Sequence, residues 1–264
     1  PAFDSSNNKI VIAYRDFGAT IEARAIVGTV SGTSISFGSS VAFTSAGDFF
    51  DIFRTVFDSN SNKIVILYRD GTNSDSGAGI VGTVSGTSIS FGTKATFNQG
   101  NTTNADAVFD STLNKIVVVY KDNANSDYGA AVVGTVSGTS ISFGSEVIYE
   151  NAATNYNSVA YDTNSQKVVV AYQDDANSDY GTAIVGTVSG TSISFGSPVV
   201  FENAAVSYVR AVYDPTAKKV VIAYMDQGNS DYGTVISGTV SGTSISFDSA
   251  TVFENAQTAY IELV

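Results

Sequence analysis

Apolar and polar residues recur in a short-strand pattern that is clearest between residues 157 and 201. Residues 157–162 (NSVAYD) predict a first strand, and residues 167–174 (KVVVAYQD) predict a second strand that is apolar on both faces. Residues 182–188 predict a third strand, and Ser189-Gly190 marks a hairpin into a fourth, residues 193–201. Polar or small residues alternate with apolar ones in the fourth strand, which is typical of a half-solvated edge strand.

This pattern repeats along the whole chain. The string GTVSGTSISF occurs five times, starting at Gly28, Gly82, Gly134, Gly186 and Gly238. One repeat of about 52 residues cannot bury both faces of its second strand, whereas radial stacking of four-stranded repeats can. We therefore expect an all-β fold: a five-bladed β-propeller with four antiparallel strands per blade, forming a single domain over residues 1–264.

The two ends of the sequence are complementary. Residues 260–264 (YIELV) align with residues 156–160, and residues 2–4 (AFD) align with residues 160–162. Together they supply one complete first strand. We therefore expect the first blade to be closed by the C-terminal strand, Tyr260–Val264, lying beside the strand built on Lys9–Asp16.

Composition narrows the range of functions. The net charge is −12, which disfavours nucleic acid and anionic membranes as partners. The sequence contains no His and no Cys, so histidine catalysis, thiol chemistry and the common zinc sites are excluded. No apolar run reaches the ~18 residues of a membrane span. The chain starts at Pro1 without an initiator Met, so we expect it to be part of a larger polypeptide.

The repeat pattern NKIVIAY followed by GTVSGTSISF resembles known families. It is similar to the five-bladed β-propellers, including the tachylectin-type lectins, and to repeat segments of marine phage virion or tail proteins and of secreted bacterial propellers. The resemblance implies a binding scaffold and an extracellular or virion-associated location. It does not extend to the sialidase-type Asp box, which needs a Trp that this sequence lacks.

Two polar motifs recur where loops are expected to share one face of the ring. The loop between the second and third strands reads NSDYG in three repeats and NSDSG, with Ser76, in another. The loop into the next blade reads Glu-Asn-Ala in three repeats, and a tyrosine follows each copy: Tyr156, Tyr208 and Tyr260. Such side chains can hydrogen-bond and stack on sugars, although turn chemistry alone also explains them. The candidate ligand-binding residues of these loops are Asp127, Tyr128, Asp179, Tyr180, Asp231, Tyr232, Glu150, Asn151, Glu202, Asn203, Glu254 and Asn255.

One loop also spaces oxygen ligands as acidic calcium loops do. Asp174, Asp175, Asn177 and Asp179 form this candidate metal site. The match to an EF-hand loop is imperfect, because Gly181 comes one residue late. No cofactor is expected otherwise.

One position on the expected innermost strands alternates in charge around the ring, in the order Glu262, Arg54, Asp106, Ser158, Arg210. This predicts a channel lined by compensating ion pairs. The alternative is a central ligand site that uses Arg54 and Arg210. The first repeat lacks NSDYG and carries a longer exit loop with Phe49 and Phe50, which either contact a partner or fold inward.

The leading hypothesis is a non-catalytic, multivalent carbohydrate-binding propeller that recognises glycans or cell-surface polysaccharide in adhesion or host recognition. The first alternative is a glycoside hydrolase or lyase, which needs two carboxylates in different environments. Asp106, Glu262, Glu22 and Asp51 are acids that occur in one repeat, and no spacing pairs them. The second alternative is a structural scaffold without a small-molecule ligand.

Overall fold

The computed structural model describes residues 1–18, 21–45 and 50–263, without the side chains of Phe50 and Ile52. It is an all-β protein with antiparallel sheets and two single 3₁₀ turns, η1 (Asp175–Asn177) and η2 (Gln227–Asn229). No helix in the described ranges has the length and apolarity to cross a membrane. The strands are β1 Ala2–Asp4, β2 Lys9–Asp16, β3 Glu22–Ser31, β4 Ser34–Phe37, β5 Val41–Ala42, β6 Phe50–Asp58, β7 Lys63–Asp70, β8 Ser76–Ser85, β9 Ser88–Phe91, β10 Ala95–Asp110, β11 Lys115–Asp122, β12 Tyr128–Ser137, β13 Ser140–Phe143, β14 Val147–Asp162, β15 Lys167–Asp174, β16 Tyr180–Ser189, β17 Ser192–Phe195, β18 Val199–Asp214, β19 Lys219–Asp226, β20 Tyr232–Ser241, β21 Ser244–Phe247 and β22 Thr251–Gln257.

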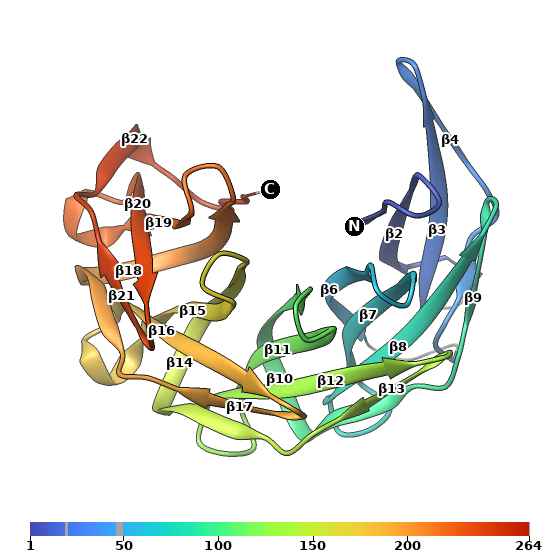
Figure 1. Cartoon of the computed structure of the whole chain (residues 1–264), viewed down its shortest axis with the longest axis horizontal. Helices are drawn as coiled ribbons and strands as arrows, with labels where there is room; N and C mark the ends of the chain where they lie inside the picture. The colour runs from blue at the N-terminus through green and yellow to red at the C-terminus, as the bar shows by residue number, and fades with distance from the viewer. Residues whose placement is uncertain (19–20, 46–49, 264) are drawn as a thin grey trace.

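Each sequence repeat forms one antiparallel unit, and the units follow one another around a common centre (Figure 1). We number them 1 to 5 from the N-terminus. In unit 4 the order is the second half of β14, then β15, then β16, and then an outer edge shared by β17 and the first half of β18. The middle strand β15 is buried along nearly its whole length, as its apolar sequence predicts.

The strands β10, β14 and β18 each belong to two units. In β14, residues 147–153 pair with β12 of unit 3, and residues 154–162 pair with β15 of unit 4. We call these three the crossing strands. The sequence predicted the two halves as separate strands, and it predicted the outer strand as one piece, whereas Gly196–Pro198 interrupt it. Extended backbone runs straight through the predicted inter-blade loop.

The turn after each inner strand is held by an aspartate. Asp4, Asp58, Asp110, Asp162 and Asp214 each accept backbone N–H groups from the residues two and three positions further on. Each aspartate therefore caps the turn that follows its strand, which is a common role of Asp in turns.

Aromatic side chains form the seams between neighbouring units. At the seam between units 4 and 5, Phe201 contacts Tyr224 and Phe247 with ring centroids 5.2 and 5.8 Å apart. The equivalent triplets pack at the other three seams: Phe43 with Tyr68 and Phe91, Phe97 with Tyr120 and Phe143, and Tyr149 with Tyr172 and Phe195. Phe97, Tyr149 and Phe201 are only 7–8% exposed, so these three seams are small closed cores, whereas Phe43 is partly buried.

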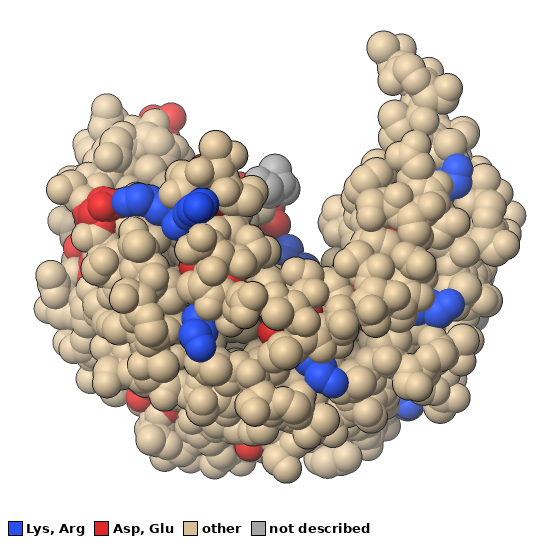
Figure 2. Space-filling view, viewed as in Figure 1, with Lys and Arg blue, Asp and Glu red and all other residues tan. Residues whose placement is uncertain are grey.

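The ring is open between unit 5 and unit 1. In Figure 1 the blue first unit and the red last unit face each other, and the space-filling view of Figure 2 shows a notch in the molecule between them. The residues that would form a fifth seam are exposed there: Phe253 is 53% exposed and Phe37 is 48% exposed. Residues 258–263 are not in a strand, and β2 pairs with β1 and β3. The predicted pairing of the C-terminal segment with Lys9–Asp16 is therefore absent from the described residues, and Val264 lies outside them.

Candidate binding sites

The structure brings the two repeated polar motifs together at three places. Tyr128 pairs with Ala153 and Gly129 with Glu150, and the register shift between these two pairs holds Asn151, which is exposed. Units 4 and 5 repeat this register at Tyr180 and Glu202 and at Tyr232 and Glu254. We call these groups the seam sites. Their members are Asp127, Tyr128, Glu150 and Asn151; Asp179, Tyr180, Glu202 and Asn203; and Asp231, Tyr232, Glu254 and Asn255.

The glutamate of each seam site is oriented by the next unit. The Tyr172 hydroxyl donates to Glu150 over 3.1 Å, and the Tyr224 hydroxyl donates to Glu202 over 2.9 Å. Burial raises the pKa of Glu150, and the nearby Asp174 charge raises it further. Glu254 is exposed because unit 5 has no following unit packed against it. Two seam sites are therefore complete in the open ring, and the third lacks its tyrosine donor.

The loop residues also have a clear structural role. The carbonyl of Asp179 accepts the backbone N–H of Val206 over 3.0 Å, which ties the loop to the crossing strand, and Asp127 and Asp231 do the same for Thr154 and Thr258. Tyr128, Tyr180 and Tyr232 begin strands and are half-buried.

The NSDYG glycine provides space for a neighbouring side chain, and the residues before it carry the left-handed backbone. Ser178 and Asp179 carry the positive φ angles, 57° and 63°. A Cβ on Gly181 would come within 2.4 Å of the Phe201 ring. The glycine therefore makes room for a seam ring, and the left-handed turn lies just before it.

The candidate calcium residues differ in burial. Asp175 and Asn177 lie in the 3₁₀ turn and are exposed, whereas Asp174 is buried on β15. Burial raises the pKa of both Asp174 and Asp175, and the Asp179 charge adds to each shift. Within the described ranges, no three carboxylates form a group suited to a metal ion. Calcium binding stays a prediction from the sequence.

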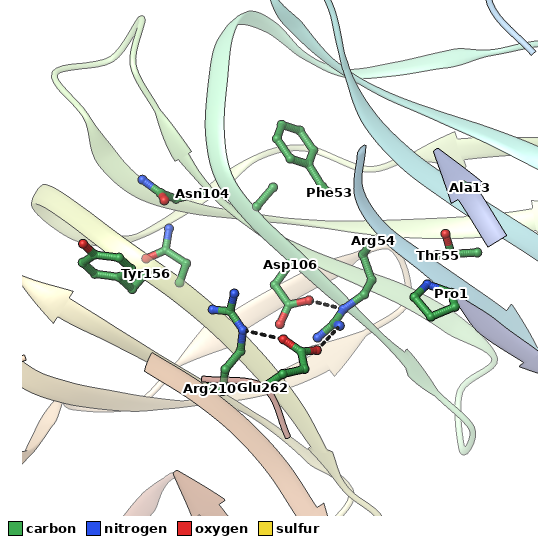
Figure 3. A pocket seen from close by; sticks show the side chains of 12 residues that line it. Pro1, Ala13, Phe53, Arg54, Thr55, Asn104, Asp106, Tyr156, Arg210 and Glu262 are labelled. Atoms are coloured by element: carbon green, nitrogen blue, oxygen red, sulfur yellow. Dashed lines mark hydrogen bonds and ion pairs between the residues drawn. The ribbon is translucent and has the colours of Figure 1, made fainter. Parts of the chain in front are cut away.

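A cleft of about 360 Å³ occupies the centre of the ring. It is lined by Arg54, Asp106, Asn157, Arg210 and Glu262, together with Pro1, Ala13, Phe53, Thr55, Asn104, Ala105 and Tyr156. Figure 3 shows Glu262 lying between the two arginines.

The predicted ring of compensating charges is confirmed. Arg54 Nε donates to Asp106 over 2.5 Å, and Arg210 Nε donates to Glu262 over 3.0 Å. Glu262 also lies 3.5 Å from Arg54 Nη1, and the Ser158 hydroxyl donates to Asp106 over 3.0 Å. Burial lowers the pKa of Arg54, but the Asp106 and Glu262 carboxylates more than offset this and raise it overall. Glu262 reaches this position although its segment is not paired as a strand.

The tyrosines that follow the three Glu-Asn-Ala motifs, noted in the sequence, form a row that begins at the cleft with Tyr156. Tyr156, Tyr208 and Tyr260 all have positive φ, between 52° and 55°. The ring centroids of Tyr156 and Tyr208, and those of Tyr208 and Tyr260, are 5.3 Å apart. A left-handed backbone at a bulky residue costs roughly 1–3 kcal/mol and is concentrated at functional positions. The signal in the sequence was a tyrosine at one fixed repeat position.

The fold has a counterpart among solved structures. No family model and no curated protein matches this chain. The crystal structure of the BP39L lectin from Burkholderia pseudomallei is similar, with a TM-score of 0.59 and 14% sequence identity. The match covers 90% of this chain and 68% of the lectin chain. At this identity the likeness concerns the fold.

Proposed function

We propose that this protein is a non-catalytic carbohydrate-binding protein whose equivalent sites are the seam sites. The observation that carries the proposal is the same register of aspartate, tyrosine, glutamate and asparagine in units 3, 4 and 5. Each site offers an exposed amide, a carboxylate and part of a tyrosine ring, and a tyrosine hydroxyl orients the carboxylate in two of the three sites. These groups match the hydroxyls and the apolar face of a sugar. The fold shared with a lectin supports the same conclusion.

Binding is favoured over catalysis by the contacts of the four acids that the sequence offered as catalytic candidates. Glu22 is paired with Arg24, Asp51 with Arg69, Asp106 with Arg54, and Glu262 with Arg210. A glycosidase needs one carboxyl kept protonated and another kept ionised, whereas all four of these acids lie beside a guanidinium. Several weak sites on one rigid ring gain avidity on a surface that repeats its sugar. We therefore propose a role in adhesion or host recognition on cell-surface polysaccharide, in an extracellular or virion-associated protein.

We also propose that the ring closes into a five-bladed β-propeller. The open end of unit 5 presents Phe253, and the open face of unit 1 presents Tyr14 and Phe37, which are the equivalents of one buried triplet at every other seam. Glu262 already bridges unit 5 to unit 2 at the centre. Closure would also place the Tyr14 hydroxyl where Glu254 needs a donor, completing the third seam site.

The test is a glycan-array screen, followed by titration of the best glycan against matched variants. Asn151→Ala, Asn203→Ala and Asn255→Ala remove one exposed amide per site. We expect monovalent affinity to fall and surface avidity to decrease stepwise as the three changes accumulate. Asn60→Ala with Asn164→Ala, in the aspartate-capped turns at the other end of the strands, is the control. Full binding by the triple variant would refute the seam sites.

A further inference from the structure

We propose that the central cleft is a second binding site, that it takes a saccharide bearing a carboxylate, and that Glu262 occupies the carboxylate position in the structure described here. This site is separate from the seam sites, so the two proposals can fail independently. The cleft combines two arginines, an unpartnered buried amide and a line of tyrosine rings.

The first step is the position of Glu262. Its carboxylate lies between Arg210 Nε, at 3.0 Å, and Arg54 Nη1, at 3.5 Å. Asp106 neutralises only one of these arginines, and it is held by Arg54, Ser158 and the backbone N–H of Val159. Glu262 has no such support, because it lies on an unpaired segment and its side chain is half exposed. A carboxylate from a ligand can therefore replace Glu262 and recover the same two contacts.

The second step is Asn157. Its side chain is 4% exposed and lines the cleft, and neither its Oδ1 nor its Nδ2 has a hydrogen-bond partner among the described residues. A buried amide without partners is costly, and it is relieved by a ligand that offers both a donor and an acceptor. A sugar hydroxyl does both.

The third step is the tyrosine line. Tyr156 lines the cleft, and the Tyr208 ring packs against the Tyr156 ring. The Tyr260 ring packs against Tyr208 in turn and is 88% exposed. Tyr156 and Tyr208 have left-handed backbone within register shifts of their crossing strands, and Tyr260 has the same left-handed backbone. Aromatic faces held in this way suit the apolar face of a pyranose, so a free inorganic anion would leave them unused.

The arginine and carboxylate charges in the cleft cancel, which explains why a ligand that displaces Glu262 must carry a carboxylate. Arg54 and Arg210 are balanced by Asp106 and Glu262, and the chain as a whole carries a net charge of −12. A neutral sugar that displaced Glu262 would leave the charge of the partly buried Arg210 without a carboxylate partner, whereas an acidic sugar would supply one.

The experiment compares methyl β-glucuronide with methyl β-glucoside, which differ in the carboxylate at one carbon, by calorimetric titration of the whole chain. We expect the glucuronide to bind more tightly. Glu262→Gln removes the internal competitor and should tighten glucuronide binding roughly fivefold, the factor equivalent to about 1 kcal/mol for a half-exposed ion pair. Arg210→Gln should abolish the preference for the glucuronide, and Arg210→Lys, which keeps the charge but loses the planar donor pair, should reduce it.

The triple seam-site variant is the matched control and should leave the glucuronide titration unchanged. Equal binding of the two sugars, or no glucuronide binding by either the parent protein or Glu262→Gln, would overturn the proposal. Loss of glucuronide binding in the triple seam-site variant would assign the sugar to the seams instead.

Discussion

Replacement of Phe253 by alanine separates an open ring from a closed one. Phe253 and Phe201 hold the same place in successive units, but Phe253 is 53% exposed and Phe201 is 7% exposed. If the ring stays open, Phe253→Ala removes little packing. If units 5 and 1 close on each other, Phe253 enters a seam like that of Phe201, and the two substitutions cost the same.

The size of the difference follows from the exposed area. A phenylalanine side chain buries roughly 200 Å² when fully packed, so about 100 Å² of Phe253 remains in water. At about 25 cal/mol per Å², closure gains about 2.5 kcal/mol from this side chain. If the ring closes, we therefore expect Phe253→Ala and Phe201→Ala each to lower the free energy of unfolding by about 3–5 kcal/mol. An open ring predicts a loss of no more than about 1 kcal/mol.

Urea unfolding of the two variants side by side provides the measurement. The double variant Phe37→Ala, Phe253→Ala adds a coupling test, because two rings in contact couple by about 0.5–1.5 kcal/mol whereas separated rings are additive. A small loss for Phe253→Ala together with a large loss for Phe201→Ala, and additive effects of Phe37 and Phe253, would refute closure.

Three further results are expected. Burial raises the pKa of Asp70, but its contacts with the Lys94 ammonium and Thr72 outweigh this and lower the pKa below 3.8. The stability that the Asp70 carboxylate contributes is therefore present above pH 3.8 and is lost as the pH falls through the lower folded-state pKa. Asp70→Asn should lower the melting temperature at pH 7 and make the melting temperature depend less on pH in the acid range. Asp162→Ala, which removes a buried cap from two backbone N–H groups and the Ser165 hydroxyl, should cost about 1–3 kcal/mol in urea unfolding, and the more exposed cap of Asp214→Ala should cost less. If the Asp174 loop binds calcium, excess calcium should raise the melting temperature over that measured with a chelator, and equal melting curves would retire that site.

The repeat period and the strand pattern were enough to predict the units. Apolar runs such as residues 167–174 form strands at the predicted positions, because a short continuous apolar run is typical of a strand that is buried on both faces. The charge series at the Ser158 position predicted the ion pairs of the channel correctly, because equivalent positions on a ring meet at its centre.

The crossing strands and the backbone conformation of the cleft tyrosines could not be predicted from the sequence. The Glu-Asn-Ala motif looks like a loop in sequence, yet it lies in extended backbone that is kinked by register shifts. A left-handed φ at Tyr156 depends on tertiary contacts, which no local propensity encodes. The gap between units 5 and 1 also could not be predicted, because complementary terminal sequences indicate which surfaces match but not whether these surfaces are in contact. The prediction for Phe49 and Phe50 in the first exit loop is not tested, because Phe49 and the Phe50 side chain lie outside the described part of the chain.

The crossing strands have a consequence for how the molecule comes apart. Because β14 supplies the outer edge of unit 3 and the inner edge of unit 4, neither sheet can melt without stripping hydrogen bonds from its neighbour. Opening events should therefore propagate along the chain instead of being confined to one repeat, and amide exchange in β11, β15 and β19 should occur at similar free energies. Unit 1 is the exception, because it joins unit 2 through a separate short strand, β5, and not through a crossing strand. We therefore expect unfolding to begin at unit 1, and any contact that stabilises the free face of unit 1 should slow amide exchange in the units that follow it.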